Sequence, residues 1–145
     1  MPAPMSRDRI YEFLAEGTRT GKLATIRTDG RPHVAPVWFV LDGDDLLFMT
    51  NEATVKGRSL RRDPRAALTV DLEEPPYAFA SVEGTVTIET DPAVMLPHSI
   101  AIARRYMGED RAEEYGRRNA MPGEYLVRLT PAHLVGRDDM AGHGA

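Results

Sequence analysis

The stretch "GKLATIRTDGRPHVAPVWFVLDGDDLLFMT", residues 21–50, carries the clearest strand and turn signals of the chain. It holds two Asp-Gly pairs, Asp29-Gly30 and Asp42-Gly43, each flanked by β-branched and aromatic residues. Such pairs favour tight turns between antiparallel strands, because glycine adopts the positive φ that these turns need. The stretch therefore predicts three antiparallel strands, at roughly 22–28, 32–41 and 45–50.

Three further β-rich segments follow and raise the predicted number of strands to six. They are "AALTVDL" (66–72), "YAFASVEGTVTIET" (77–90) and "EYLVRLT" (124–130). Six strands with hairpin connections and few helices are typical of a mainly β fold, an antiparallel barrel with flanking helices.

The helical segments of the prediction lie outside these strands, at about 6–16, about 54–62 and about 91–118. Ser6 is a candidate N-cap of the first helix, and Gly17 suits its C-terminal stop. The second helix must end near Pro64, because the residue before a proline avoids helical backbone angles. We expect the tail, residues 138–145, to be frayed.

Composition indicates one globular domain over residues 1–145 and excludes several classes of protein. The formal net charge of −4 argues against a general nucleic-acid binder. The chain has no cysteine, so it forms no disulfide or thiolate metal site, and this fits a reducing compartment. No apolar run is long enough to span a membrane, and the first residues do not look like a secretory signal. We therefore expect a cytoplasmic protein without a membrane span.

Common catalytic and metal-binding motifs are absent from the sequence. "GTRTGKL" (17–23) is one residue short of a phosphate-binding loop, and Leu23 stands where a serine or threonine should bind magnesium. There is no serine elbow of the G-x-S-x-G type and no G-x-G-x-x-G after a strand. The four histidines lack ligand spacing, so we expect no metal site. An enzyme of this sequence would need a cofactor to supply the chemistry, and we assign no catalytic side chain.

The strand predicted at 32–41 is apolar on both faces. One face carries His33, Ala35, Val37, Phe39 and Leu41, and the other carries Val34, Pro36, Trp38 and Val40. A barrel strand that faces water should alternate apolar and polar residues. We therefore expect a partner chain or a flat ligand to cover its outer face. Pro36 cannot donate to a strand ladder, which indicates a sheet edge or a bulge.

A basic segment, "VKGRSLRRDPR" (55–65), follows the third strand. Helical spacing places Lys56 and Ser59 on one face near the start of the helix, and Arg58, Arg61 and Arg62 on another. One interpretation is an anion site, because a helix N-terminus offers unpaired amides and partial positive charge to a phosphate. The other is a solvated basic face, which is the commoner meaning of a charge run.

From about Gly21 to Ile88 the sequence resembles the pyridoxamine-phosphate-oxidase-like flavin and deazaflavin proteins. Within that group it most resembles the F420-dependent reductases of actinobacterial type. The pattern T-N-x(4)-K-x(2)-S-L-x(3)-P-R after a strand carries the likeness. The resemblance implies a six-stranded split β-barrel, a homodimer, and two cofactor sites at the interface.

The resemblance also assigns roles to individual residues. It places the cofactor ring against the strand that carries Trp38, although a core or interface role for this tryptophan stays open. The resemblance places Lys56 and Ser59, with the nearby backbone, at the cofactor phosphate. It places the arginines of the basic segment, Arg58, Arg61 and Arg62, along the anionic oligoglutamate tail of the cofactor. The candidate cofactor-binding residues are Ala35, Pro36, Val37, Trp38, Thr50, Asn51, Lys56, Gly57, Arg58, Ser59 and Arg61.

Departures from the FMN-dependent members favour the deazaflavin coenzyme F420 over FMN. Ala78 and Phe79 stand where those oxidases carry an Arg-Gln pair, and the strand at 32–41 lacks their arginine. The expected function is transfer of a hydride from reduced F420 to an electron-poor conjugated double bond of a small organic substrate. The proton would come from solvent or the cofactor. An FMN-dependent oxidoreductase and a non-catalytic carrier of deazaflavin, haem or a fatty acid remain as alternatives.

Overall fold

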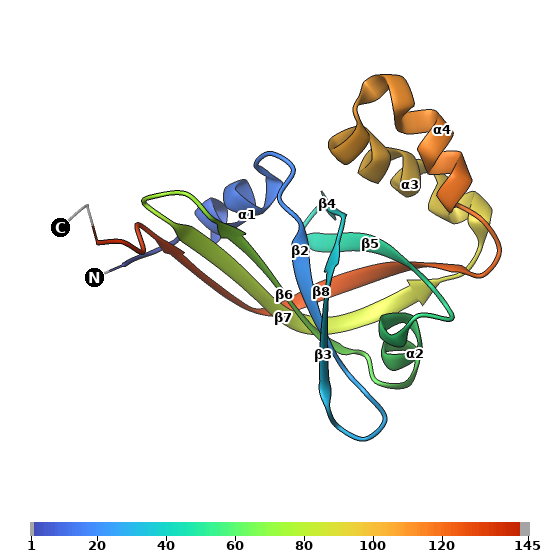
Figure 1. Cartoon of the computed structure of the whole chain (residues 1–145), viewed down its shortest axis with the longest axis horizontal. Coiled ribbons are helices and arrows are strands. Elements are labelled where there is room, and N and C mark those ends of the chain that lie inside the picture. The colour runs from blue at the N-terminus through green and yellow to red at the C-terminus, as the bar shows by residue number, and fades with distance from the viewer. Residues whose placement is uncertain (1, 143–145) are drawn as a thin grey trace.

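The computed structural model describes residues 2–142 and shows one curved antiparallel sheet with helices around it (Figure 1). Its strands are β1 (Ala3–Pro4), β2 (Gly21–Ile26), β3 (Pro32–Val37), β4 (Phe39–Asp42), β5 (Asp45–Asn51), β6 (Arg65–Leu72), β7 (Ala78–Glu89) and β8 (Glu124–Asp138). Its helices are α1 (Arg7–Ala15), α2 (Val55–Arg62), α3 (Pro92–Met107) and α4 (Glu109–Asn119). The strand order is β3-β2-β6-β7-β8-β5-β4, and β1 pairs with β8.

This arrangement confirms the predicted mainly β split barrel with flanking helices, but the predicted count of six strands is wrong. The described residues form eight strands, partly because the predicted strand 32–41 breaks at Trp38. β3 pairs with β2, whereas β4 pairs with β5 at the other end of the strand order. At the break the amide of Phe39 donates to the hydroxyl of Tyr106, 3.3 Å away. β3 is an edge strand, as Pro36 predicted.

β8 continues past the predicted end at residue 130 because a bulge accommodates Pro131. Glu83 of β7 lies opposite His133 and Gly84 lies opposite Pro131, so Ala132 has no partner. A Cβ at Gly84 would overlap the carbonyl oxygen of Thr130. The bulge therefore depends on glycine, and it lets the strand bend while both halves stay paired.

The prediction of a frayed tail is wrong over residues 138–142. Asp138 is the last residue of β8, and the amides of Met140 and Ala141 donate to the carbonyls of Tyr77 and Pro76 at 2.7 and 3.0 Å. Backbone hydrogen bonds of this kind hold a chain end against its neighbours. Residues 143–145 of the predicted tail lie outside the described part of the chain.

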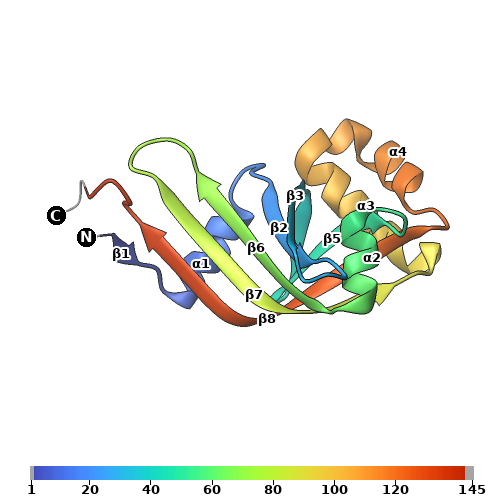
Figure 2. The ribbon, with the colours of Figure 1, turned by 60° about the horizontal axis from the view of Figure 1, so that its bottom comes forward.

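The helices lie where the sequence placed them. α1 begins after Ser6, whose hydroxyl accepts a hydrogen bond from the amide of Arg9 at 3.1 Å. It buries Ile10, Phe13 and Leu14 in the main core. α3 and α4 occupy the predicted insertion and pack together at one end of the sheet (Figures 1 and 2). Among residues 2–142, no helix is both long and apolar enough to cross a bilayer.

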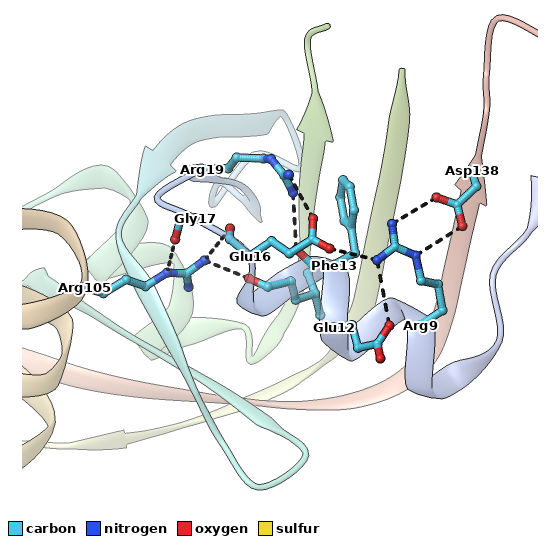
Figure 3. A network of polar contacts seen from close by, with 9 residues as sticks. Arg9, Glu12, Phe13, Glu16, Gly17, Arg19, Arg105 and Asp138 are labelled. Carbon is cyan, nitrogen blue, oxygen red and sulfur yellow. Dashed lines mark hydrogen bonds and ion pairs between the residues drawn. The ribbon is translucent and has the colours of Figure 1, made fainter. Parts of the chain in front are cut away.

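A polar network ties α1 to the end of β8 and to the loop after α1 (Figure 3). The guanidinium of Arg9 contacts Asp138 at 3.2 Å and Glu16 at 2.9 Å, and Arg19 contacts the other oxygen of Glu16 at 3.1 Å. The hydrogen bond from Arg9 is the main reason that the pKa of Glu16 lies below its ordinary value. The ionised form of Glu16 therefore stabilises the fold.

This network predicts a pH dependence of stability that Glu16→Gln should reduce. A carboxyl with a lowered pKa contributes stability that is fully present above its unfolded pKa and is lost as the pH falls through the lowered value. We therefore expect the wild-type free energy of unfolding to fall more than that of Glu16→Gln between about pH 6 and 3. Urea denaturation at each pH measures this. Glu12→Gln is the control, because the one ion pair that Glu12 makes within the described chain is a 3.9 Å contact to Arg9. An equal pH slope in wild type and Glu16→Gln would contradict the assignment.

Candidate functional site

A cavity of about 340 Å³ lies where β3 ends and where α2, α3 and α4 approach β5 and β8. Four of the predicted cofactor-binding residues line it, namely Pro36, Val37, Trp38 and Lys56. The other lining residues are Met49, Ser99, Ile102, Ala103, Asn119 and Glu124. The cavity, called the ring cavity below, therefore joins the predicted ring-facing strand to the first turn of the basic helix.

Trp38 forms a flat wall of the ring cavity. Its ring stacks on Tyr106 of α3, with centroids 5.0 Å apart and planes 2° from parallel. The Tyr106 hydroxyl donates to the carbonyl of Arg19 at 3.0 Å, and burial raises the pKa of this phenol, so it stays protonated. Trp38 is 41% exposed in spite of the stack. It is thus both a packing residue, anchored through Tyr106, and an open surface for a ligand.

The outer face of β3 has no cover within the described chain. Val34 is 66% exposed, and Pro36 and Trp38 on the same face are also exposed. Ala35 lies on the opposite face, across from Leu23 of β2, and does not line the ring cavity. That a partner chain or a flat ligand covers the outer face of β3 therefore stays a prediction.

Thr50 and Asn51, both predicted to bind cofactor, build the turn between β5 and α2. Thr54 caps α2, since its hydroxyl accepts from the amide of Gly57 at 3.0 Å and donates to the carbonyl of Asn51 at 2.8 Å. Its one proton is thereby used, so the hydroxyl of Thr50, 2.9 Å away, must donate to it. A Cβ at Gly57 would overlap the Asn51 carbonyl. Only glycine lets α2 start this close to β5.

The side chain of Asn51 is occupied as well. Its Oδ1 accepts from the amide of Ala53 at 2.9 Å, and its Nδ2 donates to Glu124 at 3.1 Å. Asn51 and Thr50 therefore position the start of α2, and neither lines the ring cavity.

Lys56 brings a free cation to the ring cavity. Its ammonium makes no hydrogen bond or ion pair with any residue between positions 2 and 142. It lies in the first turn of α2, where unpaired amides and the helix dipole add partial positive charge. An anion at this end of the cavity would contact the ammonium of Lys56 and the first amides of α2. Of the acidic residues that the structure describes, only Glu124 lines the cavity, and it accepts a hydrogen bond from Asn51.

The structure separates Lys56 from Ser59, which the sequence placed on one face. Ser59 and Arg58 line a second cavity on the other flank of α2, together with Val55 and Arg62. Positions 55, 58, 59 and 62 follow the i, i+3, i+4, i+7 spacing of one helix face. Helical spacing also allows the predicted grouping of Lys56 with Ser59 and of Arg58 and Arg62 with Arg61, so the sequence alone does not separate the two sets.

Arg61 lies apart from both cavities. Its guanidinium carbon sits 5.9 Å from the centre of the Tyr125 ring, and the residue lines neither the ring cavity nor the second one. The predicted arginine face of α2 is therefore not a single surface. Sequence analysis also missed Arg27 and Arg31, which face α2 from the β2–β3 hairpin. The feature of the sequence that could have identified these two arginines is their position on either side of the Asp29-Gly30 turn.

Solved structures of the same fold include proteins of known and unknown activity. A conserved hypothetical protein, Rv2991 from Mycobacterium tuberculosis, is 26% identical with a TM-score of 0.81, over 94% of this chain and 87% of that one. An F420 reductase is 28% identical with a TM-score of 0.68, over 86% and 94%. HutZ, a haem storage protein from Vibrio cholerae, is 20% identical with a TM-score of 0.71, over 90% and 94%, and shares the fold alone.

A family profile covers most of the sequence. The profile described as pyridoxamine 5'-phosphate oxidase matches residues 7–136, from the start of α1 to near the end of β8. The matched range includes every residue of the ring cavity and of the β5–α2 turn. The resemblance seen in the sequence is thereby confirmed, and the chain belongs to the pyridoxamine 5'-phosphate oxidase family.

Proposed function

We propose that this protein is a reductase that uses the reduced deazaflavin coenzyme F420 and transfers a hydride to an electron-poor conjugated double bond of a small organic substrate. The observation that carries the proposal is the meeting, in one cavity, of an exposed indole and an unpaired cation. Trp38 offers a flat wall, and Lys56 offers charge at a helix start. Similarity to an F420 reductase and membership of an oxidoreductase family support it.

The residues of the ring cavity fit a cofactor with a flat ring and a phosphate. Pro36, Val37 and Trp38 form an apolar side, whereas Lys56 with the first amides of α2 forms the anionic end. When bound, the deazaflavin supplies the hydride from ring carbon C5. The protein binds and orients the ring, and residues of α3 and α4 line the cavity on another side.

Two polar side chains of the ring cavity, Ser99 and Glu124, are engaged in structural hydrogen bonds. Ser99 donates to the carbonyl of Gly116 at 2.8 Å, and Glu124 accepts from Asn51. A proton donor should instead have its hydrogen free to reach the substrate. Lys56, the unpaired cation of the same cavity, is assigned to the cofactor phosphate, so we propose that solvent or the cofactor supplies the proton.

Side-by-side titration with F420 and FMN tests the choice of cofactor. Fluorescence should report binding of F420 and weaker or absent binding of FMN, and reduced F420 should be oxidised when a conjugated acceptor is added. A yellow protein that retains FMN would instead identify an FMN-dependent oxidoreductase. Tight F420 binding without turnover of any acceptor would identify a carrier.

The uncovered face of β3 leads to a prediction about assembly. We propose that a second copy covers Val34 and its neighbours on this face, forming a homodimer. Light scattering should give about twice the 16.1 kDa chain mass. Val34→Lys should shift the protein toward monomer, because it places a charge on the contact face, whereas Val94→Lys on α3, a comparably exposed position at 48%, should not. A monomeric wild type at micromolar concentration would contradict this arrangement.

A further inference from the structure

The side of the ring cavity that α3 and α4 supply carries an amide side chain beside apolar ones. Ile102 and Ala103 of this side are buried, and the hydroxyl of Ser99 is used by the carbonyl of Gly116. Asn119, the last residue of α4, lines the cavity with an exposed side chain. Its carboxamide makes no hydrogen bond within residues 2–142. Of the described residues on this side, Asn119 alone offers a ligand a free polar side chain.

The backbone around Asn119 is held on both sides. Its carbonyl accepts from the amide of Met121 at 3.0 Å, and the amide of Ala120 donates to the carbonyl of Gly116 at 3.1 Å. The side chain of Ala120 is buried in the smaller core cluster. A Cβ at Gly116 would overlap the backbone of Ile100, so this turn of α4 lies directly against α3. The main chain at Asn119 therefore has a defined place beside the cavity, and only its side-chain torsions are left to a ligand.

The common structural reasons for an asparagine at a helix end do not apply to Asn119. Asparagine is favoured there because it tolerates a left-handed backbone and because its side chain can bond to nearby backbone groups. The non-glycine residues with positive φ in the described chain are Tyr77 and Asp139, so Asn119 does not use that conformation. Its carboxamide also bonds to no backbone group between positions 2 and 142. Because the fold does not need an amide here, a role toward a ligand is favoured.

Hydride addition to a conjugated carbonyl compound places negative charge on the carbonyl oxygen. With the deazaflavin as the reductant, a C–H bond forms at the β-carbon and the π electrons of the double bond shift toward that oxygen. Solvent then supplies the proton to the α-carbon. Hydrogen-bond donors aimed at the oxygen on which charge develops stabilise the transition state. The amide nitrogen of an asparagine is such a donor, and it keeps its protons throughout.

We propose that Asn119 recognises the carbonyl oxygen of an α,β-unsaturated ketone or aldehyde, to which its Nδ2 donates a hydrogen bond. The hydride source rests on the proposed function, whereas recognition of the carbonyl group does not. Ile102 and Ala103 offer an apolar surface to the rest of the substrate. Glu124 in the same cavity disfavours an unsaturated carboxylate, because like charges repel. The substrate class is therefore the neutral enones and enals.

Infrared spectroscopy of benzylideneacetone, an unsaturated ketone, tests this contact in the protein without cofactor. With the carbonyl carbon isotopically labelled, the band of the bound ketone should lie below its position in an apolar solvent, because a hydrogen bond weakens the C=O bond. In Asn119→Leu the band should return to the apolar-solvent position. Arg118→Gln is the matched control, since Arg118 precedes Asn119 on α4 but lies over Tyr115 and does not line the cavity. The control should give the wild-type band, and the urea midpoint of unfolding should be the same in all three proteins.

Turnover with reduced F420 gives a second measurement. Asn119→Leu should lower kcat for benzylideneacetone about 100-fold, which is the usual loss when one donor to a developing oxyanion is removed. The dissociation constant of F420 should not change, because the variant alters no group assigned to the cofactor. Wild type should reduce benzylideneacetone in preference to cinnamate, the matching carboxylate.

Failure of the ketone to bind, or an equal carbonyl band in wild type and Asn119→Leu, would overturn the inference. An unchanged kcat in Asn119→Leu would also overturn it, while leaving the proposed function in place. Equal turnover of cinnamate would overturn the assigned substrate class. A carbonyl band that depends on Asn119 in a protein that fails to bind F420 would sustain the recognition of the carbonyl and reject the proposed function.

Discussion

Replacing Arg105 with methionine is expected to lower the free energy of unfolding by about 3 kcal/mol. The guanidinium donates to the carbonyls of Phe39, Leu14 and Gly17 at 2.7, 2.8 and 3.0 Å. These acceptors belong to the β3–β4 break and to the end of α1, so one side chain of α3 joins three parts of the fold. Figure 3 shows the contact of Arg105 with Gly17. Methionine retains much of the apolar volume but leaves the carbonyls unpaired, and hydrogen bonds from a charged donor contribute about 1.5–3 kcal/mol each.

The direction of the pKa shift of Arg105 is consistent with a guanidinium that is buried among carbonyl acceptors. Burial lowers the pKa of the guanidinium, so the charged form loses hydration on folding. Carbonyl acceptors and the nearby ring of Phe39, 4.7 Å from the guanidinium carbon, offset that loss. The residue therefore stabilises the fold only while its acceptors stay in place.

Arg104→Met is the matched control in urea denaturation. Arg104 precedes Arg105 on α3, but within residues 2–142 its guanidinium pairs with Glu109 alone, at 2.6 Å on the surface. Exposed pairs contribute little, so the control should lie within about 0.5 kcal/mol of the wild type. Equal losses in the two variants would show that general charge, not the carbonyl contacts, accounts for the effect.

Local signals predicted much of the fold. The two Asp-Gly turns, the Ser6 cap and Pro36 at a sheet edge report short-range backbone preferences, and the structure bears them out. The break at Trp38 has a different origin. The chain there passes from one end of the strand order to the other, and the position is stabilised by Tyr106, far away in sequence. No pattern within residues 32–41 records that partner.

Local sequence also fails to distinguish the two arginines of α3. Arg104 and Arg105 are adjacent and identical in type, and the sequence alone predicts a solvated helix face for both. Tertiary packing makes one a surface ion pair and the other a half-buried tie between helix and barrel. In α2 helical spacing allows two groupings, because Ser59 lies three positions after Lys56 and four positions after Val55. The packing of α2 beside the 27–31 hairpin places Ser59 with Val55 and Arg58, in a different cavity from Lys56.

Lys56→Ala is expected to weaken F420 binding by about 1.5–3 kcal/mol, which is about 10- to 150-fold in the dissociation constant. The ammonium lines the ring cavity and has no partner within residues 2–142, so the fold itself does not need it. We therefore expect the free energy of unfolding to change by less than about 0.5 kcal/mol. Fluorescence titration gives the binding constant, and urea denaturation of the same preparations gives the stability.

Arg61→Ala separates a phosphate contact from general attraction to a basic helix. Arg61 carries the same charge on the same helix, but it lies over Tyr125 and lines neither cavity. Its loss should weaken F420 binding only slightly, and mostly at low salt, because exposed charges are screened within about 8–10 Å at ordinary ionic strength. The loss in Lys56→Ala should persist at high salt, since a direct hydrogen bond to phosphate is short and partly shielded. If both variants lose affinity equally and salt removes both losses, α2 attracts the cofactor without holding its phosphate. An unchanged dissociation constant in Lys56→Ala would place the phosphate away from the ring cavity.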